Sequence, residues 1–572
     1  MTSATLITAL RTTAATVGDE KGVRFYADPT TSTFRGWREL DERARRIAQS
    51  LQAAGHQPGE RVIIALAPGL QWPDAAYGAL YAGLVLVPAP VVGYGTTGAL
   101  AARINGLAAA SEASLVLTEP AIVAALGEDA DTIELPVRVI DDLLAGDAGA
   151  WVEPDIDGDA TSFLLYTSGS TGDPKGVIGT HGTFLATTET CAELFSLDST
   201  SVLVGWAPLH HAMGLIIQVI LPAVLGADSI MLATDQFQRR PIVWLQLISR
   251  HRATMSVAGN FAFALSAKLA TDAQVAELDL SSLTTLLCGS EPVRAETLDA
   301  FLARFASTGI TADAVLPAFG MTEAMLITSK RPGRPIRFTS FDAAEVSAGR
   351  LVGAEGEGSV AMVSNGQPAS NTSVVIVDPD TLEPVPDGTV GEVWVSSPMV
   401  GPGYFLRPDA TAETFGHRLP GSEHEYLRSG DLASIVDDEL YVTGRLKEVI
   451  IVRGRNLYPQ DIEATAATAH PAVGISAAFE LDGHPSAVGI VAEYDAEALA
   501  GTTLPDLAEA LRATLTQRVS LPSVAVALVE PGLLPRTPTG KVRRRPTLAA
   551  IEAGSLTTTF SRGYRDAVAT AH

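Results

Sequence analysis

The sequence has little cysteine and little basic charge, and both shortages exclude classes of protein. Its 572 residues include only 2 cysteines, too few for a disulfide framework or a cysteine-rich zinc site. It has 40 Lys and Arg residues and 65 Asp and Glu residues, which give a formal net charge of -25. Binding to a nucleic acid duplex needs a contiguous basic surface, so we expect no nucleic acid partner.

Long uninterrupted hydrophobic runs are also absent. The longest apolar stretch, residues 214–230, is interrupted by Gln218, Pro222 and Asp228, whereas a membrane span needs about 18 clean apolar residues. The first residues lack a basic leader followed by a sustained apolar core. We therefore expect no membrane span, no export signal and a cytoplasmic location.

What the sequence does contain is a regular alternation of short apolar runs with longer helical patterns. Hydrophobic residues make up 47%, enough for well-buried cores in three or four domain-sized units. Apolar runs between turn residues, alternating with alanine-rich helical stretches, predict an α/β fold with mostly parallel, helix-covered sheets. Such runs begin near residues 61, 83, 113, 228 and 282.

The pattern changes twice toward the C-terminus. After about residue 365, short strands joined by Asp, Pro and Gly turns predict an antiparallel segment. Beyond Gly444, strands at 448–452 and 486–494 and a helix over 506–519 predict a small separate α+β unit.

The most informative segment is Leu164 to Gly176, an apolar strand followed by Gly, Ser and Thr residues and then Pro174 and Lys175. Glycines let the backbone approach an anion, hydroxyls and amides donate to phosphate oxygens, and the lysine adds positive charge. The spacing differs from the Walker loop and from the Gly-x-Ser-x-Gly nucleophile motif. The segment therefore predicts a different kind of polyphosphate cradle.

A second glycine motif, Gly93 to Gly98, fits the Gly-x-Gly-x-x-Gly pattern of nicotinamide-binding proteins. Pro88 and Pro90 interrupt the strand that should precede it, and the motif alone is weak evidence. An oxidoreductase remains a remote alternative.

The cradle resembles the phosphate loop of the adenylate-forming superfamily, and six further motifs resemble that family in the same order. Two of them match an adenine-side loop and the aromatic-Gly-x-Thr-Glu motif. The others match a structural motif, a ribose-binding motif, a hinge and a catalytic-lysine motif. The six lie at residues 288–292, 318–323, 391–404, 428–431, 444–447 and 538–541.

This resemblance implies an acetyl-CoA synthetase-like fold with an N-terminal adenylation body, 1–446, and a mobile C-terminal domain, 447–572, hinged at Lys447. It implies catalytic roles for Lys541, Glu323 and His211, and ATP and Mg²⁺ as cofactors, with Glu323 holding the metal. It also implies a set of nucleotide-binding residues: Thr167, Ser168, Gly169, Ser170, Thr171, Gly172, Lys175, Gly289, Ser290, Glu291, Phe319, Gly320, Met321, Thr322, Asp431 and Arg445.

Three features resemble the fatty acyl-AMP ligase subfamily. They are the post-hinge segment 454–463, the segment 205–215 and an insertion near 331–359 that in the subfamily restrains domain movement. Two residues depart from the usual pattern, since Ala212 replaces an Asp and Asn365 replaces a Cys.

The implied reaction converts a fatty acid and ATP to an acyl-adenylate and pyrophosphate. The acyl group then passes to the phosphopantetheine thiol of an acyl carrier protein. The nearest alternative is an acyl-CoA ligase that uses the same residues. Two basic clusters, 541–545 and Lys330 with Arg331, Arg334 and Arg337, are candidates for docking an acidic carrier protein.

Overall fold

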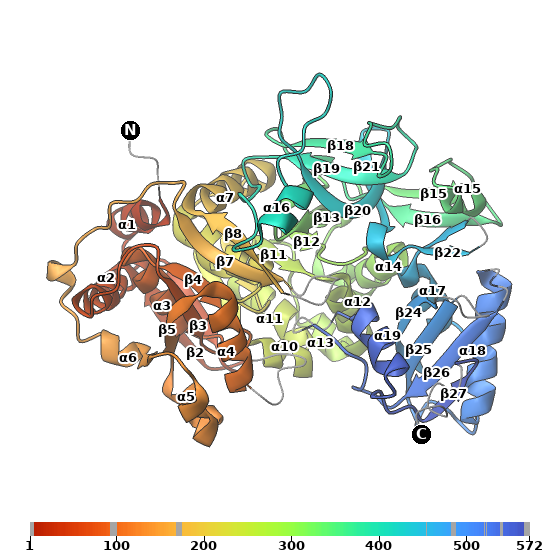
Figure 1. Ribbon diagram of the computed structural model, residues 1–572, viewed down its shortest axis with the longest axis horizontal. Helices are drawn as coiled ribbons and strands as arrows, with labels where there is room; N and C mark the ends of the chain where they lie inside the picture. The colour runs from red at the N-terminus through yellow and green to blue at the C-terminus, as the bar shows by residue number, and fades with distance from the viewer. Residues whose placement is uncertain are drawn as a thin grey trace.

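The computed structural model describes residues 5–91, 100–167, 174–452, 455–481, 488–519, 521, 523–537 and 541–564. Two large sheets dominate the N-terminal part, an antiparallel sheet follows them, and a smaller unit ends the chain (Figure 1). The predicted α/β class, with mostly parallel sheets and an antiparallel segment, is confirmed.

The larger sheet has nine described strands in the order β17-β14-β13-β12-β11-β9-β10-β1-β2. Its centre, from β13 to β1, is parallel, and its outer pairs are antiparallel. The central strands therefore point their carboxyl ends to one edge. The strands are β1 (Gly22–Tyr26), β2 (Ser32–Gly36), β9 (Val202–Gly205), β10 (Asp228–Leu232), β11 (Met255–Ala258), β12 (Thr285–Cys288), β13 (Val315–Met321), β14 (Met325–Ser329) and β17 (Gln367–Pro368).

The second sheet has six described strands in the order β6-β5-β3-β4-β7-β8, parallel except for the final β7–β8 hairpin. The apolar runs predicted near 61, 83 and 113 are its strands β3, β4 and β5. The strands are β3 (Arg61–Ala65), β4 (Val85–Pro88), β5 (Ala113–Thr118), β6 (Val137–Val139), β7 (Thr161–Thr167) and β8 (Lys175–Thr180).

The main core lies between these sheets. One cluster of buried residues joins Val62 of β3 and Leu203 of β9 with side chains of four intervening helices, including Trp37 and Phe184. Further clusters cover the outer faces of both sheets. The intervening helices are α1 (Leu6–Thr16), α2 (Trp37–Ala53), α3 (Gln71–Tyr81) and α7 (His181–Phe195), and the outer ones include α4 (Leu100–Ser111), α11 (Ile242–His251), α12 (Asn260–Leu269) and α14 (Ala295–Arg304).

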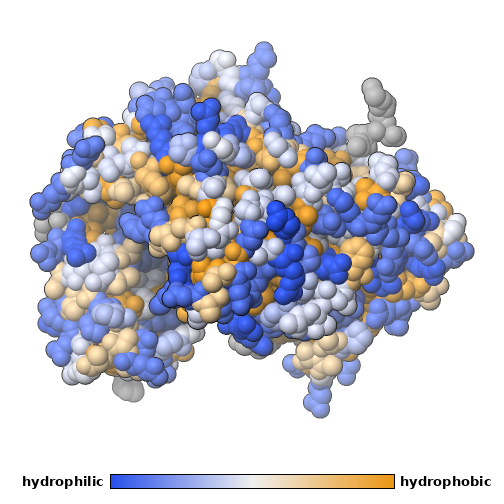
Figure 2. Space-filling model, turned by 180° about the vertical axis from the view of Figure 1, so that it is seen from behind, coloured by the Kyte–Doolittle hydropathy of each residue, from blue (hydrophilic) through white to orange (hydrophobic). Residues whose placement is uncertain are grey.

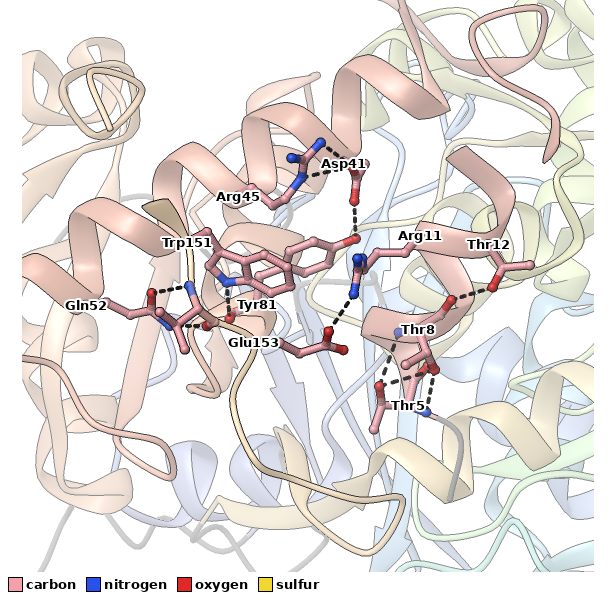
Figure 3. Close-up of polar contacts among 11 residues, drawn as sticks. Thr5, Thr8, Arg11, Thr12, Asp41, Arg45, Gln52, Tyr81, Trp151 and Glu153 are labelled. Carbon is pink, nitrogen blue, oxygen red and sulfur yellow. Dashed lines mark hydrogen bonds and ion pairs between the residues drawn. The ribbon is translucent and has the colours of Figure 1, made fainter. Parts of the chain in front are cut away.

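A polar network fastens the N-terminal helices to the segment that leads into β7 (Figure 3). The Arg11 guanidinium pairs with Glu153, and the Trp151 indole donates to the Tyr81 carbonyl at 2.8 Å. The Tyr81 hydroxyl in turn donates to Asp41 at 2.8 Å. These contacts hold the approach to the predicted phosphate loop against α1, α2 and α3.

The antiparallel segment forms a sheet in the order β18-β19-β20-β21, next to the two-stranded β15–β16 pair (Figure 1). The predicted insertion falls on β15, the helix α15 (Ala343–Ser347) and the start of β16. The strands are β15 (Phe338–Asp342), β16 (Ser359–Val363), β18 (Ser373–Val377), β19 (Gly391–Ser396), β20 (Leu427–Val436) and β21 (Glu439–Arg445).

The last unit has its own core around Ile490, Leu511 and Val526. Its mixed sheet runs β24-β25-β26-β27 and is flanked by helices, as Figure 1 shows in blue. A hairpin of β22 (Ile450–Val452) and β23 (Arg455–Leu457) precedes it. Its elements are α17 (Pro459–Ala467), β24 (Val473–Glu480), β25 (Val488–Tyr494), α18 (Leu504–Arg518), β26 (Val524–Val529), α19 (Arg544–Glu552) and β27 (Phe560–Arg562).

Hydrophilic residues cover most of the rear face, with hydrophobic residues in scattered groups between them (Figure 2). Among the described residues, every helix is too short or too polar to span a bilayer.

Candidate active site

The carboxyl edge of the nine-stranded sheet opens into a pocket. Trp206 follows β9, Thr234 follows β10, Gly259 follows β11 and Ser290 follows β12, so four parallel strands each contribute to one wall. Ligands of open α/β sheets bind at this edge, outside the carboxyl ends of the strands. The complete lining is Trp206, Ala207, Pro208, His211, Met213, Thr234, Gln238, Gly259, Phe261, Ser290, Glu291 and Lys541.

Aromatic rings form much of the apolar wall. The Trp206 ring stacks on Phe237 with centroids 3.6 Å apart and meets Phe261 edge-on at 5.9 Å. Gly259 leaves room for them, because a Cβ there would lie 2.8 Å from the Glu291 carboxylate and 3.1 Å from the Phe261 ring. The wall is therefore suited to an apolar chain.

His211 lies in this pocket and caps the short helix α8 (Ala212–Leu215). Its Nδ1 accepts from the Met213 backbone N–H at 3.2 Å, which places the proton of the neutral ring on Nε2. Burial lowers the pKa of His211 to about 3, with smaller contributions from Lys541 and His210. At neutral pH the ring is an uncharged donor, and Ala212 provides no carboxylate beside it.

Glu291 joins the apolar wall to the charged end of the pocket. Its Oε1 accepts from the Phe261 backbone N–H at 2.6 Å, at the first turn of α12. Burial raises the pKa of this carboxyl, and the Lys541 and Arg294 charges act in the opposite direction. Ser290, beside it, has a left-handed backbone with φ of 64°, and the predicted loop 288–292 thus lies in the site.

Lys541 comes from the C-terminal unit and lines the same pocket. Its backbone N–H donates to the Thr537 hydroxyl at 3.0 Å, and its carbonyl accepts from the Thr537 N–H at 2.8 Å. Burial lowers the pKa of Lys541, while Glu291 and Asp431 act to raise it. Lys541, the predicted catalytic residue, therefore brings a cation close to Glu291 and Asp431, two of the predicted nucleotide-binding residues. Pro538, Thr539 and Gly540 of the same motif lie outside the described residues.

The predicted phosphate cradle lies between β7 and β8. Thr167 and Lys175 face each other as the last and first residues of these antiparallel strands. The Lys175 ammonium lies 4.9 Å from the centre of the Tyr404 ring. The remaining cradle residues, Ser168, Gly169, Ser170, Thr171 and Gly172, fall outside the described residues.

Glu323 is 8% exposed and contacts the same Tyr404 side chain over which Lys175 lies. The Tyr404 hydroxyl donates to its Oε1 at 2.8 Å, and the Gly401 N–H donates to its carbonyl at 3.0 Å. No group of three His, Cys, Asp or Glu residues is placed to hold a metal ion within the described ranges. A single oriented carboxylate fits an Mg²⁺ whose other positions are taken by phosphate and water oxygens.

The aromatic motif before Glu323 forms the carboxyl end of β13. Phe319, Gly320 and Met321 are its last residues, and Thr322 lies in the turn that follows. Only glycine fits at position 320, because a Cβ there would lie 2.1 Å from the Met325 carbonyl oxygen. The motif thus approaches the site from the strand next to β12.

The predicted ribose residues pair across the β20–β21 hairpin. Asp431 lies opposite Arg445, whose Nε donates to Asp431 Oδ1 at 3.1 Å. Burial raises the pKa of Asp431, and the Arg445 charge acts to lower it. The charges of Asp431 and Arg445 also act on the pKa of Lys541, in opposite directions. The hairpin and the C-terminal lysine are therefore electrostatically coupled.

Glu392 orients the turn that presents Asp431, a role that the sequence analysis missed. Its Oε2 accepts from Arg428 Nε at 2.9 Å and from the Trp394 indole at 3.1 Å, and its Oε1 accepts from the Gly430 N–H at 3.1 Å. From the sequence, the motif 391–394 predicts only a structural segment. Tyr404, Trp206 and Gln238 were likewise not predicted as site residues.

Three residues of the predicted basic docking clusters already have partners within the chain. Lys330 is buried and donates to the Asp313 carbonyl, and Arg337 pairs with Asp437. Arg544 makes a two-pronged pair with Glu463 and a further bond to Glu448. Arg337 and Arg544 are paired with carboxylates of this chain and Lys330 is buried, so these three residues are poor docking groups. The predicted hinge residue Lys447 is half-exposed and lies 3.4 Å from Glu413.

Comparison with known proteins agrees with this geometry. Residues 12–405, which include the Gly93–Gly98 segment outside the described ranges, match the family described as AMP-binding enzyme. The chain is 35% identical to the medium-chain-fatty-acid–[acyl-carrier-protein] ligase JamA of Moorena producens, over 91% of this chain and 90% of that protein. It is 34% identical to the long-chain-fatty-acid–AMP ligase FadD28 of Mycobacterium tuberculosis, over 89% and 90%.

Solved structures of fatty acyl-adenylate ligases have a similar fold. The fatty acyl-adenylate ligase of L. pneumophila, in complex with acyl adenylate and pyrophosphate, has a TM-score of 0.76 and 29% identity, with 98% of each chain covered. A structure from the study of the E. coli and L. pneumophila ligases has a TM-score of 0.85 and 27% identity, covering 96% of this chain and 98% of that one. The chain therefore belongs to the adenylate-forming superfamily of AMP-binding enzymes, in its fatty acyl-AMP ligase branch.

Proposed function

We propose that this protein activates a fatty acid as its acyl-adenylate, with release of pyrophosphate, and then transfers the acyl group to the phosphopantetheine thiol of a carrier protein. One observation carries the proposal. Lys541 lines the same pocket as Trp206 and Phe261, so an apolar chain and the anionic groups that must react share one site.

The first step joins two anions, a carboxylate and the α-phosphate of ATP. The work of the enzyme is therefore to neutralise charge and to align the groups in line. The acid would lie with its chain against the aromatic wall and its carboxylate toward Lys541. The neutral His211 ring would donate its Nε2–H to that carboxylate without itself changing protonation.

The nucleotide would lie across the ends of both sheets. Lys175 and the hydroxyls of Thr167 and its loop would contact the outer phosphates, and Asp431 has two oxygens for the two ribose hydroxyls. Glu323, held by Tyr404, would bind Mg²⁺, which supplies positive charge against the phosphate oxygens. Lys541 and Arg445 add the protein's own positive charge on the α-phosphate side.

The second step needs a different arrangement, because Lys541 occupies the region that the thiol must enter. We propose that the C-terminal domain, beginning at Lys447, rotates after adenylation and withdraws Lys541. The helix α15 of the insertion packs against β23, just beyond this hinge. That contact supports restrained rotation, and hence a carrier-bound thiol rather than free CoA as the acceptor.

Product analysis tests the proposal. The full chain is incubated with ATP, Mg²⁺ and a series of fatty acids, alone, with CoA, or with a carrier protein bearing phosphopantetheine. We expect pyrophosphate release, acyl-AMP that CoA does not discharge, and acylation of the carrier. Efficient acyl-CoA formation would instead establish the CoA ligase alternative, and absence of any acyl-AMP would refute adenylation.

A further inference from the structure

The end of the acyl pocket farthest from the nucleotide residues contains polar groups that the proposed reaction does not use. The sheet order β13-β12-β11-β9-β10 sets the direction of the pocket. Ser290 and Glu291, which follow β12, lie at the nucleotide side, and Thr234 and Gln238, which follow β10, lie at the other end. Three strand spacings of about 4.8 Å separate these ends by roughly 14 Å.

Gln238 is the most conspicuous of these groups. It lies in the short helix α10 (Thr234–Arg239), lines the pocket and is half-buried. Within the described part of the chain, its side-chain amide has no hydrogen-bond partner. The helix is firmly placed, because the neighbouring Phe237 is fully buried and stacks on Trp206.

A second unpartnered group lies in the same wall. The Trp206 indole is 4% exposed, and its Nε1–H is buried without an acceptor in the described structure. Thr234 links the helix of Gln238 to the segment of Trp206, because its hydroxyl donates to the Trp206 carbonyl at 2.9 Å. The Trp206 Nε1–H has almost no accessible surface, so of these two groups it is the Gln238 amide that is open to a ligand. Burying an unpaired donor is unfavourable, and a plain alkyl chain against that amide would leave it unpaired.

Resting on the proposed function, we propose that the pocket selects a carboxylic acid whose chain carries an oxygen function, a hydroxyl or a carbonyl, in its distal half. That oxygen would accept from the Gln238 amide, while the rest of the chain lies against Trp206, Phe261 and Met213. A site built to hydrogen-bond a substrate oxygen discriminates against the analogue that lacks it.

The test uses pyrophosphate release by the full chain with ATP and Mg²⁺. The substrates are matched sets of octanoic and decanoic acids and their terminal hydroxy and penultimate oxo derivatives. We expect kcat/KM for the best oxygenated acid to exceed that of its parent by about three- to tenfold. Substitution Gln238→Leu should remove or reverse this preference.

Gln236→Leu is the matched control, since Gln236 lies on the same short helix but outside the pocket lining; it should leave the preference unchanged. Two results would overturn the inference and leave the function standing. They are robust turnover with the unsubstituted acid preferred, or an oxygenated-acid preference that survives the Gln238→Leu substitution. If no acid releases pyrophosphate, the proposed function fails and the inference falls with it.

Discussion

The two halves of the active site are built in different ways. The apolar half comes from consecutive loops at one edge of one sheet, those after β9, β10, β11 and β12. The charged half combines separate parts of the chain. Lys175 comes from the second sheet, Glu323 from the turn after β13, Asp431 from the antiparallel sheet and Lys541 from the C-terminal unit.

This difference predicts a division of labour. A wall fixed by one continuous sheet should set which acid is accepted, whatever the position of the C-terminal unit. An assembled cluster of charges should set the rate and the affinity for ATP, and it should depend on each contributing part. Substitutions in the charged half should therefore change turnover and leave the ranking of acids unchanged.

The largest effect is expected for Lys541→Ala. Removal of this C-terminal cation from the pocket should lower the rate of pyrophosphate release at least a hundredfold, the usual loss when a preorganised donor is deleted. The ranking of a fatty acid series should stay as in the wild type. Lys447→Ala, which changes a half-exposed lysine, is the control for the first step. A loss below tenfold, or a reordered acid series, would contradict the division.

Next in size is Asp431→Asn. The amide retains one acceptor oxygen but loses the charge that faces Arg445 and the proposed ribose site. We expect KM for ATP to rise about tenfold or more, as for the loss of hydrogen bonds to a charged group, with KM for the acid changed much less. Asp437→Asn alters a carboxylate at the far end of the same hairpin. Equal effects of the two substitutions on KM for ATP would argue against a ribose contact.

A smaller effect is expected for Tyr404→Phe, which removes the O–H that orients Glu323. The Mg²⁺ concentration for half-maximal pyrophosphate release should rise about two- to tenfold, the value of one hydrogen bond. Tyr426→Phe serves as the comparison, because that hydroxyl has only weak contacts, to Ser373 and Ser422. An unchanged Mg²⁺ requirement in Tyr404→Phe would separate Glu323 from metal binding.

The sequence predicted the charged half better than the apolar half. Residues such as Lys541, Asp431 and Glu323 lie in short motifs whose chemistry is readable, and the structure brings them together. The apolar wall is only partly readable, because Trp206 lies in the segment 205–215 whereas Phe261 and Gln238 join it only through the order of the strands. Nor does spacing reveal Glu392, whose role depends on a turn and a neighbouring strand.

The basic clusters show a second limit of prediction from sequence. Charge counting cannot tell a free arginine from one already paired, and Arg544 and Arg337 are paired with carboxylates far away in sequence. The strands near 61, 113 and 228 were predictable because local patterning determines them. Their order in the sheets was not, because it depends on contacts between distant segments.

Glu291 lies at the border of the two halves and gives the finest test of their separation. One of its oxygens fixes the Phe261 backbone, and its charge acts to raise the pKa of Lys541. Glu291→Gln keeps an acceptor for Phe261 and removes the charge. The pKa of Lys541 should then fall further, so the ammonium would lose its proton at a lower pH.

The alkaline limb of the pH profile of kcat/KM for pyrophosphate release should accordingly move to lower pH. The ranking of acids should not change, because Phe261 remains anchored. Glu296→Gln, an exposed carboxylate in the first turn of α14, should leave both quantities as they are. A limb that stays in place, or moves up, would show that Glu291 does not act on the charge of Lys541. A changed acid ranking would show that the two halves are coupled through this residue.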